Sequence, residues 1–163
     1  MPGPASIVID KEKIDIGLFK QAQYSLPDIM LHLNTAIPFV ALVDGEAAAQ
    51  CLIDDKGYYM DVTHVAYSTE EVLMELLIHI EEHYKEENKA FIEIGCGNAN
   101  MELYALFQRI GFRVTGVKPD YFIQDTQKVE VLNAIANIDM IRFRYNLRAR
   151  RLETIGSDAS GRT

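Results

Sequence analysis

Apolar residues recur with a helical period through one long segment of the chain. Between residues 69 and 87 they are three or four positions apart, which predicts an amphipathic helix with a buried face of Leu73, Leu76, Leu77, Ile80 and Tyr84. Ser68 and Glu71 have capping-box spacing, in which each side chain bonds the other residue's N–H, and they place the helix start. Residues 18–24 form a shorter helical pattern, and Ser25, followed by a proline, predicts another helix start.

Strand-like patterns surround these helices. Asp44-Gly45 between two apolar runs is a strong hairpin signal, because its turn needs residues that tolerate positive φ. Apolar and polar positions alternate through residues 141–147, which predicts a half-buried last strand. The other predicted elements are an extended segment over 5–17, strands over 38–43, 47–53, 58–67, 91–94 and 112–117, and a helix over 101–110. This order predicts an α+β fold with a mixed, mostly antiparallel central sheet flanked by helices.

Length and composition are typical of one globular domain. The chain has 163 residues, of which 48% are hydrophobic, and this is enough for one core. We expect a single domain over residues 1–150 and a disordered polar tail over residues 151–163. The N-terminus lacks a signal-peptide pattern and no apolar run has the length of a membrane span, so a cytoplasmic location is expected. Cys51 and Cys96 form no CxxC unit, and we expect both to be reduced.

Charge is spread unevenly along the chain. The net charge is −8, but residues 141–163 carry six arginines against Glu153 and Asp158, a local charge of +4 that leaves −12 for residues 1–140. Such an acidic body should repel nucleic acids and anionic membranes, and it should attract cationic ligands. We therefore expect neither nucleic acid nor membrane as a partner, and we interpret the arginines as part of a solvated tail.

One longer motif carries most of the functional information. Asn100-x-x-Leu103-x-x-Leu106-Phe107-x-x-x-Gly111-Phe112, together with the predicted order of elements, resembles the GNAT superfamily of N-acetyltransferases over roughly residues 37–147. The signature of that family at this place is N-x-x-A-x-x-L-Y-x-x-x-G-F. The resemblance implies transfer of an acetyl group from acetyl-CoA to a primary amine of a small molecule or peptide. A homodimer is compatible with it.

The resemblance also implies where the coenzyme binds. In this family the exposed backbone edge of one central strand pairs with the pantetheine amides of acetyl-CoA, as an added strand would. The pyrophosphate sits on N–H groups at the start of the helix that follows. The candidate coenzyme contacts implied in this way are Val65, Ala66, Tyr67, Ser68, Thr69, Glu70 and Asn100.

A base that frees the amine and an acid that protonates the departing thiolate complete the chemistry of the family. Asp61 and His64 lie three positions apart on one predicted strand, so regular alternation would point them to opposite faces. His64 is the preferred base because the pKa of histidine lies near neutrality. Phe107 replaces the acidic tyrosine of the family, and Tyr104, one turn earlier, is the candidate substitute.

Departures from the family pattern support a second hypothesis. The phosphate-binding loop of the family, Q/R-x-x-G-x-G/A, should follow Tyr67, but Ser68-Thr69-Glu70-Glu71 occurs there without a glycine. First-turn carboxylates stabilise a helix by about 0.3–1 kcal/mol each, but they compete with a bound anion. The chain would then be a non-catalytic binding or assembly module that kept the scaffold and lost acetyl-CoA binding. Both hypotheses stay open on the sequence.

A third hypothesis comes from Glu93-x-Gly95-x-Gly97, which resembles the S-adenosylmethionine motif of Rossmann-like methyltransferases. In those enzymes an acidic residue and G-x-G-x-G frame the cofactor. Here Ala99 replaces the third glycine, and only 46 residues follow Val117, too few for the remaining strands and helices of such a sheet. This alternative is the least favoured of the three.

His79-Ile80-Glu81-Glu82-His83 matches H-x-x-E-H, the zinc motif of inverted metalloproteases. The two histidines are one helical turn apart, as ligands on a helix must be. They lie, however, on the flank of the buried stripe, among acidic residues. We interpret this flank as a solvated acidic face and expect no metal there.

Overall fold

The computed structural model describes residues 4–98, 100–119 and 139–148. These residues belong to two compact units, one built from residues up to 92 and from 146 onward, the other from residues 93–145. The single domain over residues 1–150 stays a prediction, and the predicted tail over residues 151–163 lies outside the described residues. In the described ranges, no helix has both the length and the apolar composition needed to cross a membrane.

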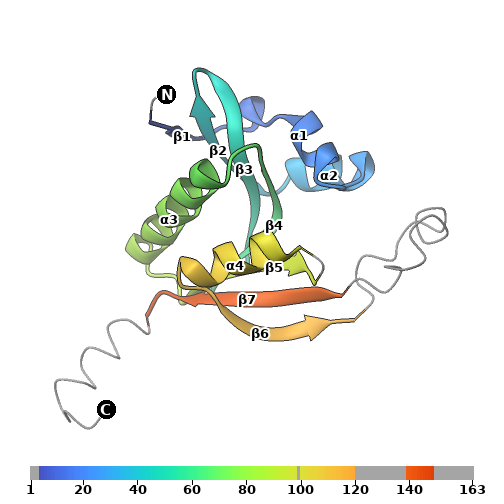
Figure 1. The fold of residues 1–163 in the computed structure, drawn as a ribbon. Coiled ribbons are helices and arrows are strands. Elements are labelled where there is room, and N and C mark those ends of the chain that lie inside the picture. The colour runs from blue at the N-terminus through green and yellow to red at the C-terminus, as the bar shows by residue number, and fades with distance from the viewer. Residues whose placement is uncertain (1–3, 99, 120–138, 149–163) are drawn as a thin grey trace, which may run out of the picture. The chain divides into compact units, whose positions relative to one another are not determined.

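Four antiparallel strands form the sheet of the first unit, in the order β1-β2-β3-β4 (Figure 1). Their bounds are Ser6–Ile9 for β1, Ile37–Val43 for β2, Glu46–Asp55 for β3 and Met60–Tyr67 for β4. Asp44 and Gly45 have φ values of 52° and 81°, as a tight hairpin turn requires, so the predicted hairpin is confirmed. The segment predicted as extended contains β1, a short 3₁₀ turn over Lys11–Lys13 and the start of a helix.

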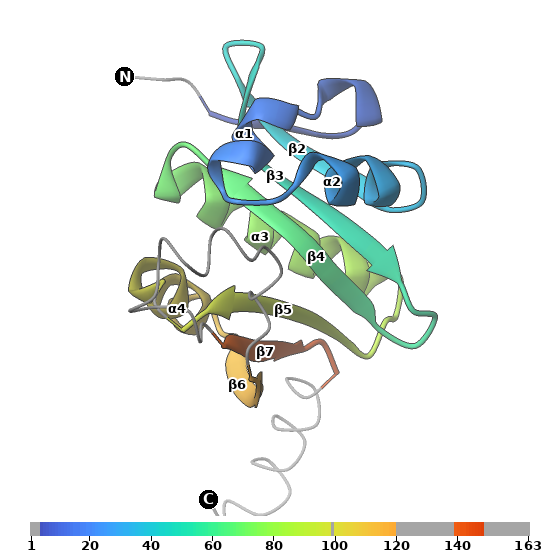
Figure 2. The ribbon, with the colours of Figure 1, turned by 90° about the vertical axis from the view of Figure 1, so that its right-hand side faces the viewer.

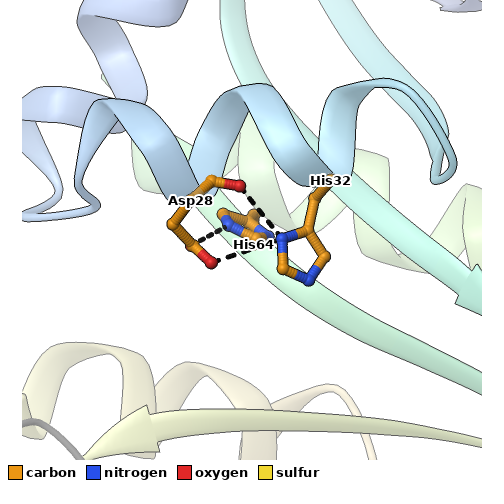
Figure 3. Close-up of side chains that lie close together, drawn as sticks. All are labelled: Asp28, His32 and His64. Atoms are coloured by element: carbon orange, nitrogen blue, oxygen red, sulfur yellow. Dashed lines mark hydrogen bonds and ion pairs between the residues drawn. The ribbon is translucent and has the colours of Figure 1, made fainter.

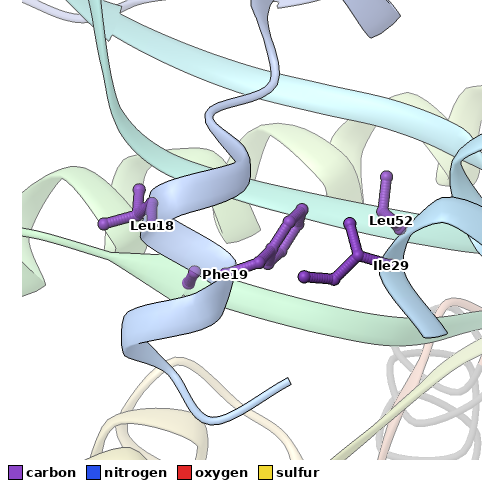
Figure 4. Packing of buried hydrophobic residues seen from close by; sticks show 5 residues of the cluster. Leu18, Phe19, Ile29 and Leu52 are labelled. Carbon is purple, nitrogen blue, oxygen red and sulfur yellow. The ribbon is translucent and has the colours of Figure 1, made fainter. Parts of the chain in front are cut away.

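Helices cover both faces of this sheet (Figure 2). Helices α1 (Ile16–Gln21) and α2 (Leu26–Leu33) lie on one face, and α3 (Glu70–Glu86) lies on the other. On the face of α1 and α2, apolar side chains of the helices and the sheet form a cluster of Leu18, Phe19, Ile29, Leu52 and Ala66 (Figure 4). On the other face, α3 buries all five residues of the predicted stripe, which confirms that prediction.

Gln50 anchors the N-terminal helices to the sheet. Its side chain is fully buried in β3, where an amide must find hydrogen-bond partners. Nε2 of Gln50 donates to the backbone oxygen of Asp15 at 2.7 Å, and Oε1 accepts from the backbone N–H of Asp15 at 2.8 Å. Asp15 is itself the N-cap of α1, so this pair of bonds places the start of α1 over β3. Ser25 caps α2 as predicted.

Within its described residues, the second unit contains three strands and one helix. Strand β5 (Phe91–Gly97), helix α4 (Met101–Arg109), strand β6 (Arg113–Lys118) and strand β7 (Met140–Asn146) follow one another along the chain. The strands lie in the order β5-β7-β6, with β6 and β7 antiparallel. Phe143 of β7 is fully buried, whereas the side chain of its neighbour Arg144 is 40% exposed, so the predicted half-buried last strand is confirmed.

Both units combine helices with antiparallel strand pairs. The ladders β1–β2, β2–β3, β3–β4 and β6–β7 are all antiparallel. The predicted α+β class with a mostly antiparallel sheet flanked by helices is therefore confirmed. A Rossmann-like methyltransferase would instead require successive parallel strands, so this arrangement contradicts the methyltransferase alternative.

Candidate functional site

A β-bulge in β4 decides which side chains share a face of the sheet. Leu52 pairs with His64 and Ile53 pairs with Val62, so Thr63 is an extra residue in β4 at this point of the ladder. Neighbouring side chains on a regular strand point to opposite faces. Here the bulge brings the hydroxyl oxygen of Thr63 to 2.8 Å from Nδ1 of His64.

The predicted opposite orientation of Asp61 and His64 is wrong because of this bulge. Asp61 pairs with Asp54 of β3. His64 pairs with Leu52, which lies two positions from Asp54 and therefore on the same face of β3. Because directly paired residues share a face, Asp61 and His64 lie on one face, which is also the face of Leu52 that α1 and α2 cover.

On this face His64 belongs to a cluster with Asp28 and His32 of α2, hereafter the Asp28–His32–His64 cluster (Figure 3). Nε2 of His64 lies 2.6 Å from Oδ2 of Asp28. Nδ1 of His32 lies 3.3 Å from Oδ1 of Asp28 and 3.0 Å from its backbone oxygen. One donor atom from each residue lies within 4.8 Å of the other two. The bulged strand and α2 thus bring together three side chains of types that can bind protons or metal ions.

Burial controls the charge of His64. Its side chain is 2% exposed, whereas that of Asp28 is 42% exposed. The imidazole packs against the ring of Tyr24 with 4.5 Å between centroids, and edge to face against Phe19 at 5.7 Å. Burial lowers the pKa of His64 and outweighs the opposite effect of its hydrogen bond to Asp28. The imidazole is therefore neutral at neutral pH and keeps one lone pair.

Tyr24 also accepts a hydrogen bond from the backbone edge of β4 that points away from β3. The N–H of Val65 donates to the hydroxyl oxygen of Tyr24 at 3.0 Å, so it points away from β3. Backbone groups alternate in direction along an antiparallel strand, so those of Ala66 point toward β3 and those of Tyr67 point away again. Of the three residues predicted to contact the coenzyme along this edge, Val65 and Tyr67 have backbone groups that point away from β3. The N–H of Val65 already has a hydrogen-bond partner, the hydroxyl of Tyr24.

The N-terminus of α3 differs from those of the other α-helices in the described ranges. Those three helices each have a side chain that caps the first turn, from Asp15, Ser25 and Asn100. The N-cap residue of α3 is Thr69, and its side chain accepts no hydrogen bond from that turn. The predicted capping box of Ser68 and Glu71 is wrong, because the hydroxyl and the N–H of Ser68 both donate to the oxygen of Ala48.

In the second unit, the signature motif has structural roles. Oδ1 of Asn100 accepts from the N–H of Leu103 at 3.1 Å and so caps α4. The ring of Tyr104 packs edge to face against Phe143, with 5.5 Å between centroids. Gly111 has a φ of +108°, and a Cβ there would lie 2.8 Å from the ring of Tyr145. A coenzyme contact of Asn100 and an acid role of Tyr104 stay predictions.

The residues of the methyltransferase hypothesis also have structural roles. Glu93 forms ion pairs with Arg142 at 3.2 Å and Arg144 at 2.8 Å, both on β7. A Cβ on Gly95 would lie 2.7 Å from the sulfur of Met140, so the missing side chain makes room for β7. The acid and the first glycine of this motif therefore serve packing within the second unit.

His79 and His83 lie one turn apart on α3, with their rings stacked 6.5 Å between centroids. Nε2 of His83 is 3.1 Å from a carboxylate oxygen of Glu87. Both rings also lie beside Phe39 of β2, with centroids 6.4 Å and 5.5 Å from that ring. The interpretation of this flank as free of metal stays a prediction.

Sequence reasoning missed Asp28, His32 and Tyr24. Asp28 and His32 are four positions apart on a predicted helix, which places them on one face of it. That spacing was the available signal, but only the fold shows that this face meets His64. The interaction of Tyr24 with β4 has no local sequence signal, because it joins positions 41 residues apart.

No protein-family model and no curated protein significantly matches the sequence. Among solved structures, an IAA acetyltransferase of Bacillus cereus is 26% identical, with a TM-score of 0.72 over 86% of this chain and 99% of that one. A GNAT family acetyltransferase of Elizabethkingia anophelis with acetyl-CoA bound is 19% identical, with a TM-score of 0.73 over 88% and 98% of the two chains.

An acetyltransferase of Bacillus subtilis in complex with CoA is 21% identical, with a TM-score of 0.71 over 87% of this chain and 98% of that one. The last two similarities concern the fold alone. The neighbour from Bacillus cereus has the same fold and is also similar in sequence, with 26% identity over nearly its whole length. By its fold and its N-x-x-x-x-x-L-x-x-x-x-G-F signature, the chain belongs to the GNAT superfamily of acetyltransferases.

Proposed function

We propose that this chain transfers the acetyl group of acetyl-CoA to a primary amine. Its structural neighbours are acetyltransferases, which supports acetyl transfer at the level of the family. In the proposed complex the pyrophosphate binds at Thr69 and Glu70, and the pantetheine arm pairs with the outward backbone groups of Val65 and Tyr67. The acceptor is a small-molecule or peptide amine, because an acidic protein favours cationic ligands.

The observation that carries this proposal is the start of α3 directly after β4. The first N–H groups of a helix lack partners within the helix and attract anions through the helix dipole. Thr69 does not cap these groups, and both Ser68 and Thr69 are exposed. The N–H of Ser68 is bonded to Ala48, so the proposed phosphate contacts begin at Thr69.

We assign the proton transfer to His64 acting through Asp28. His64 is too buried to meet an amine directly, whereas Asp28 is 42% exposed and lies 2.6 Å from Nε2 of His64. Asp28 would contact the incoming ammonium group, and His64 would position the carboxylate and accept the proton. Asp61, on the same face, is a further candidate for binding the ammonium group. Tyr104 remains the proposed acid for the departing thiolate.

One contact favours the second candidate function, a non-catalytic binding module. The N–H of Val65, which would have to pair with pantetheine, already donates to the hydroxyl of Tyr24. The glycine-free start of α3 also places the carboxylates of Glu70 and Glu71 in the first turn of the proposed phosphate site. A chain with these two features could keep the scaffold for binding another partner.

Isothermal titration with acetyl-CoA separates the two candidates. Micromolar affinity, together with an acetylated product from a panel of primary amines, would support the enzyme. Absence of heat at millimolar acetyl-CoA would reject it and support the module. S-adenosylmethionine serves as the control ligand, because it shares the adenosine of CoA and lacks the pyrophosphate.

A further inference from the structure

We propose that the Asp28–His32–His64 cluster binds a divalent transition-metal ion, with zinc(II) as the best match to its donors. The cluster offers two imidazole nitrogens and one carboxylate, which are ligands that zinc takes in proteins. Asp28 and His32 are one turn apart on α2, so one helix carries two of the three ligands. Three protein ligands leave a fourth position for water. The proposed function uses Asp28 and His64 for proton transfer, but metal binding is measured without coenzyme, so either proposal can fail without the other.

Two of the three donor pairs in the cluster are spaced nearly as in an occupied site, and all three donor atoms lie within 4.8 Å of one another. Zinc lies at about 2.1 Å from nitrogen and oxygen ligands, so tetrahedral ligand atoms lie about 3.4 Å apart. Nδ1 of His32 and Oδ1 of Asp28 are already 3.3 Å apart. Nε2 of His64 and Oδ2 of Asp28 are 2.6 Å apart and must separate by about 0.8 Å, which a small rotation of the half-exposed Asp28 side chain provides. His32 would exchange its contact with the backbone oxygen of Asp28 for the ion.

Thr63 orients His64 for this role. Its hydroxyl donates to the backbone oxygen of Leu52 at 3.2 Å and lies 2.8 Å from Nδ1 of His64. A hydroxyl has one hydrogen, so a Thr63 that donates to Leu52 accepts the N–H at Nδ1 and leaves the lone pair of His64 on Nε2. Metal-binding histidines are commonly fixed by such a bond at the other ring nitrogen.

A metal ion can take the place of the proton between His64 and Asp28. Nε2 of His64 and Oδ2 of Asp28 share a hydrogen bond at 2.6 Å, so a proton lies between these two atoms in the metal-free protein. A metal ion that displaces this proton can bind both atoms, because ligands give up their protons when a metal ion binds. The side chains of His32 and Asp28, 26% and 42% exposed, give an ion access from solvent.

Cobalt(II) titration tests the proposal, because tetrahedral cobalt absorbs visible light and reports on its ligands. The chain has four histidines, and the two outside the cluster are His79 and His83 of α3. The variant His79→Gln/His83→Gln therefore retains the cluster histidines alone and serves as the parent protein. We expect one cobalt ion per chain, displaced by zinc. Adding His32→Gln should weaken binding by at least about 10-fold, whereas adding Glu46→Gln, at an exposed position in the hairpin, should leave it unchanged.

His32→Gln is the deciding variant, because His32 is partly exposed and its replacement leaves the contacts of the buried His64 in place. Circular dichroism would verify that each variant folds. Absence of tetrahedral absorption in the parent, or equal binding after His32→Gln, would overturn the proposal and leave a shared proton between Asp28 and His64. Acetyl-CoA titrations with and without zinc separate this result from the proposed function, because cobalt binding is measured without coenzyme.

Discussion

At the scale of single residues, Tyr24 connects the two parts of the candidate site. Its ring packs against His64 of the Asp28–His32–His64 cluster, and its hydroxyl accepts the N–H of Val65 on the outer edge of β4. One side chain therefore supports the cluster and occupies a backbone donor that a coenzyme would use. Its replacement affects both in ways that can be measured.

Tyr24→Phe keeps the ring and removes the acceptor of the Val65 N–H. Val65 is 6% exposed, so its N–H loses a partner that water replaces poorly. We expect the free energy of unfolding to fall by about 1–3 kcal/mol, measured by chemical denaturation. Tyr58→Phe, at a side chain that is 63% exposed, is the control. Equal stability of the two variants would mean that the hydroxyl of Tyr24 contributes nothing.

The ion pairs of Glu93 with Arg142 and Arg144 predict that the stability of the protein depends on pH. Burial raises the pKa of Glu93, but hydrogen bonds from Arg144 and Arg142 outweigh it and leave the pKa below its ordinary value. A depressed pKa in the folded state contributes stability above the unfolded value, near 4.5, and this contribution is lost as the pH falls through the folded pKa.

Glu93→Gln should therefore lower the melting temperature near neutral pH and lower it much less in acid. The measurement is a series of thermal melts of both proteins from neutral to strongly acidic pH. Glu46→Gln, at an exposed position in the hairpin, is the control for loss of a carboxylate. A difference between wild type and Glu93→Gln that stays constant over this range would contradict the role assigned to the two arginines.

At the scale of elements, the start of α3 determines whether a coenzyme can bind. Two opposing features meet there. The first turn has no side-chain cap from Thr69, which leaves the helix dipole available to an anion, but Glu70 and Glu71 place negative charge in the same turn. The balance between dipole and carboxylates can be measured.

Glu70→Gln/Glu71→Gln should tighten acetyl-CoA binding. Each carboxylate removed from a first helical turn changes the interaction with a nearby anion by about 0.3–1 kcal/mol, so about a 2- to 5-fold gain per residue is expected by titration calorimetry. Glu75→Gln, exposed on the same helix beyond the first turn, is the matched control. Unchanged affinity in the double variant would place the phosphate elsewhere.

Elements whose signals are local could be predicted from the sequence. Asp44-Gly45 predicts its hairpin because the turn itself demands positive φ, and the stripe of α3 follows from helical spacing alone. Asn100 and Gly111 carried the family resemblance because a cap and a positive φ restrict the residue type. Such features leave a trace at the position where they act.

The candidate site was less predictable because it depends on pairing between distant segments. A bulge has no required residue type, so nothing at Thr63 marks the shift that brings His64 and Asp61 onto one face. The capping box failed for a related reason: Ser68 is still bonded to β3, and the helix starts one residue later than the motif implies. Asp28 and His32 could be recognised as candidate site residues only from the packing of α2 on β4, which places them beside His64.

At the scale of the whole molecule, charge is the property that bears on function. The chain carries a net charge of −8 and has a pI of about 5.0. A field of this sign raises the local concentration of cationic amines and disfavours anions such as CoA. The uncapped start of α3 would have to supply the local attraction that the overall charge does not.

Salt should therefore affect cationic and neutral acceptors differently. If the chain acetylates amines, kcat/KM for a diamine should fall by about 3- to 10-fold between about 0.02 and 0.2 M salt, because screening removes the long-range attraction. Steady-state kinetics with a neutral amine of similar size is the control. Equal salt dependence for both acceptors would mean that overall charge plays no part in selecting the acceptor.

The bulge at Thr63 also has a consequence for chain length. Thr63 is one extra residue in β4, and it shifts the alternation of side chains between the two faces of the sheet. Deleting one residue there would move the side chains of Met60, Asp61 and Val62 to the opposite face relative to His64. Conversely, an insertion on one side of Thr63 combined with a deletion on the other side would leave the more distant side chains of β4 on their present faces. The count of residues in β4, more than their identity, is thus what aligns its histidine with α2.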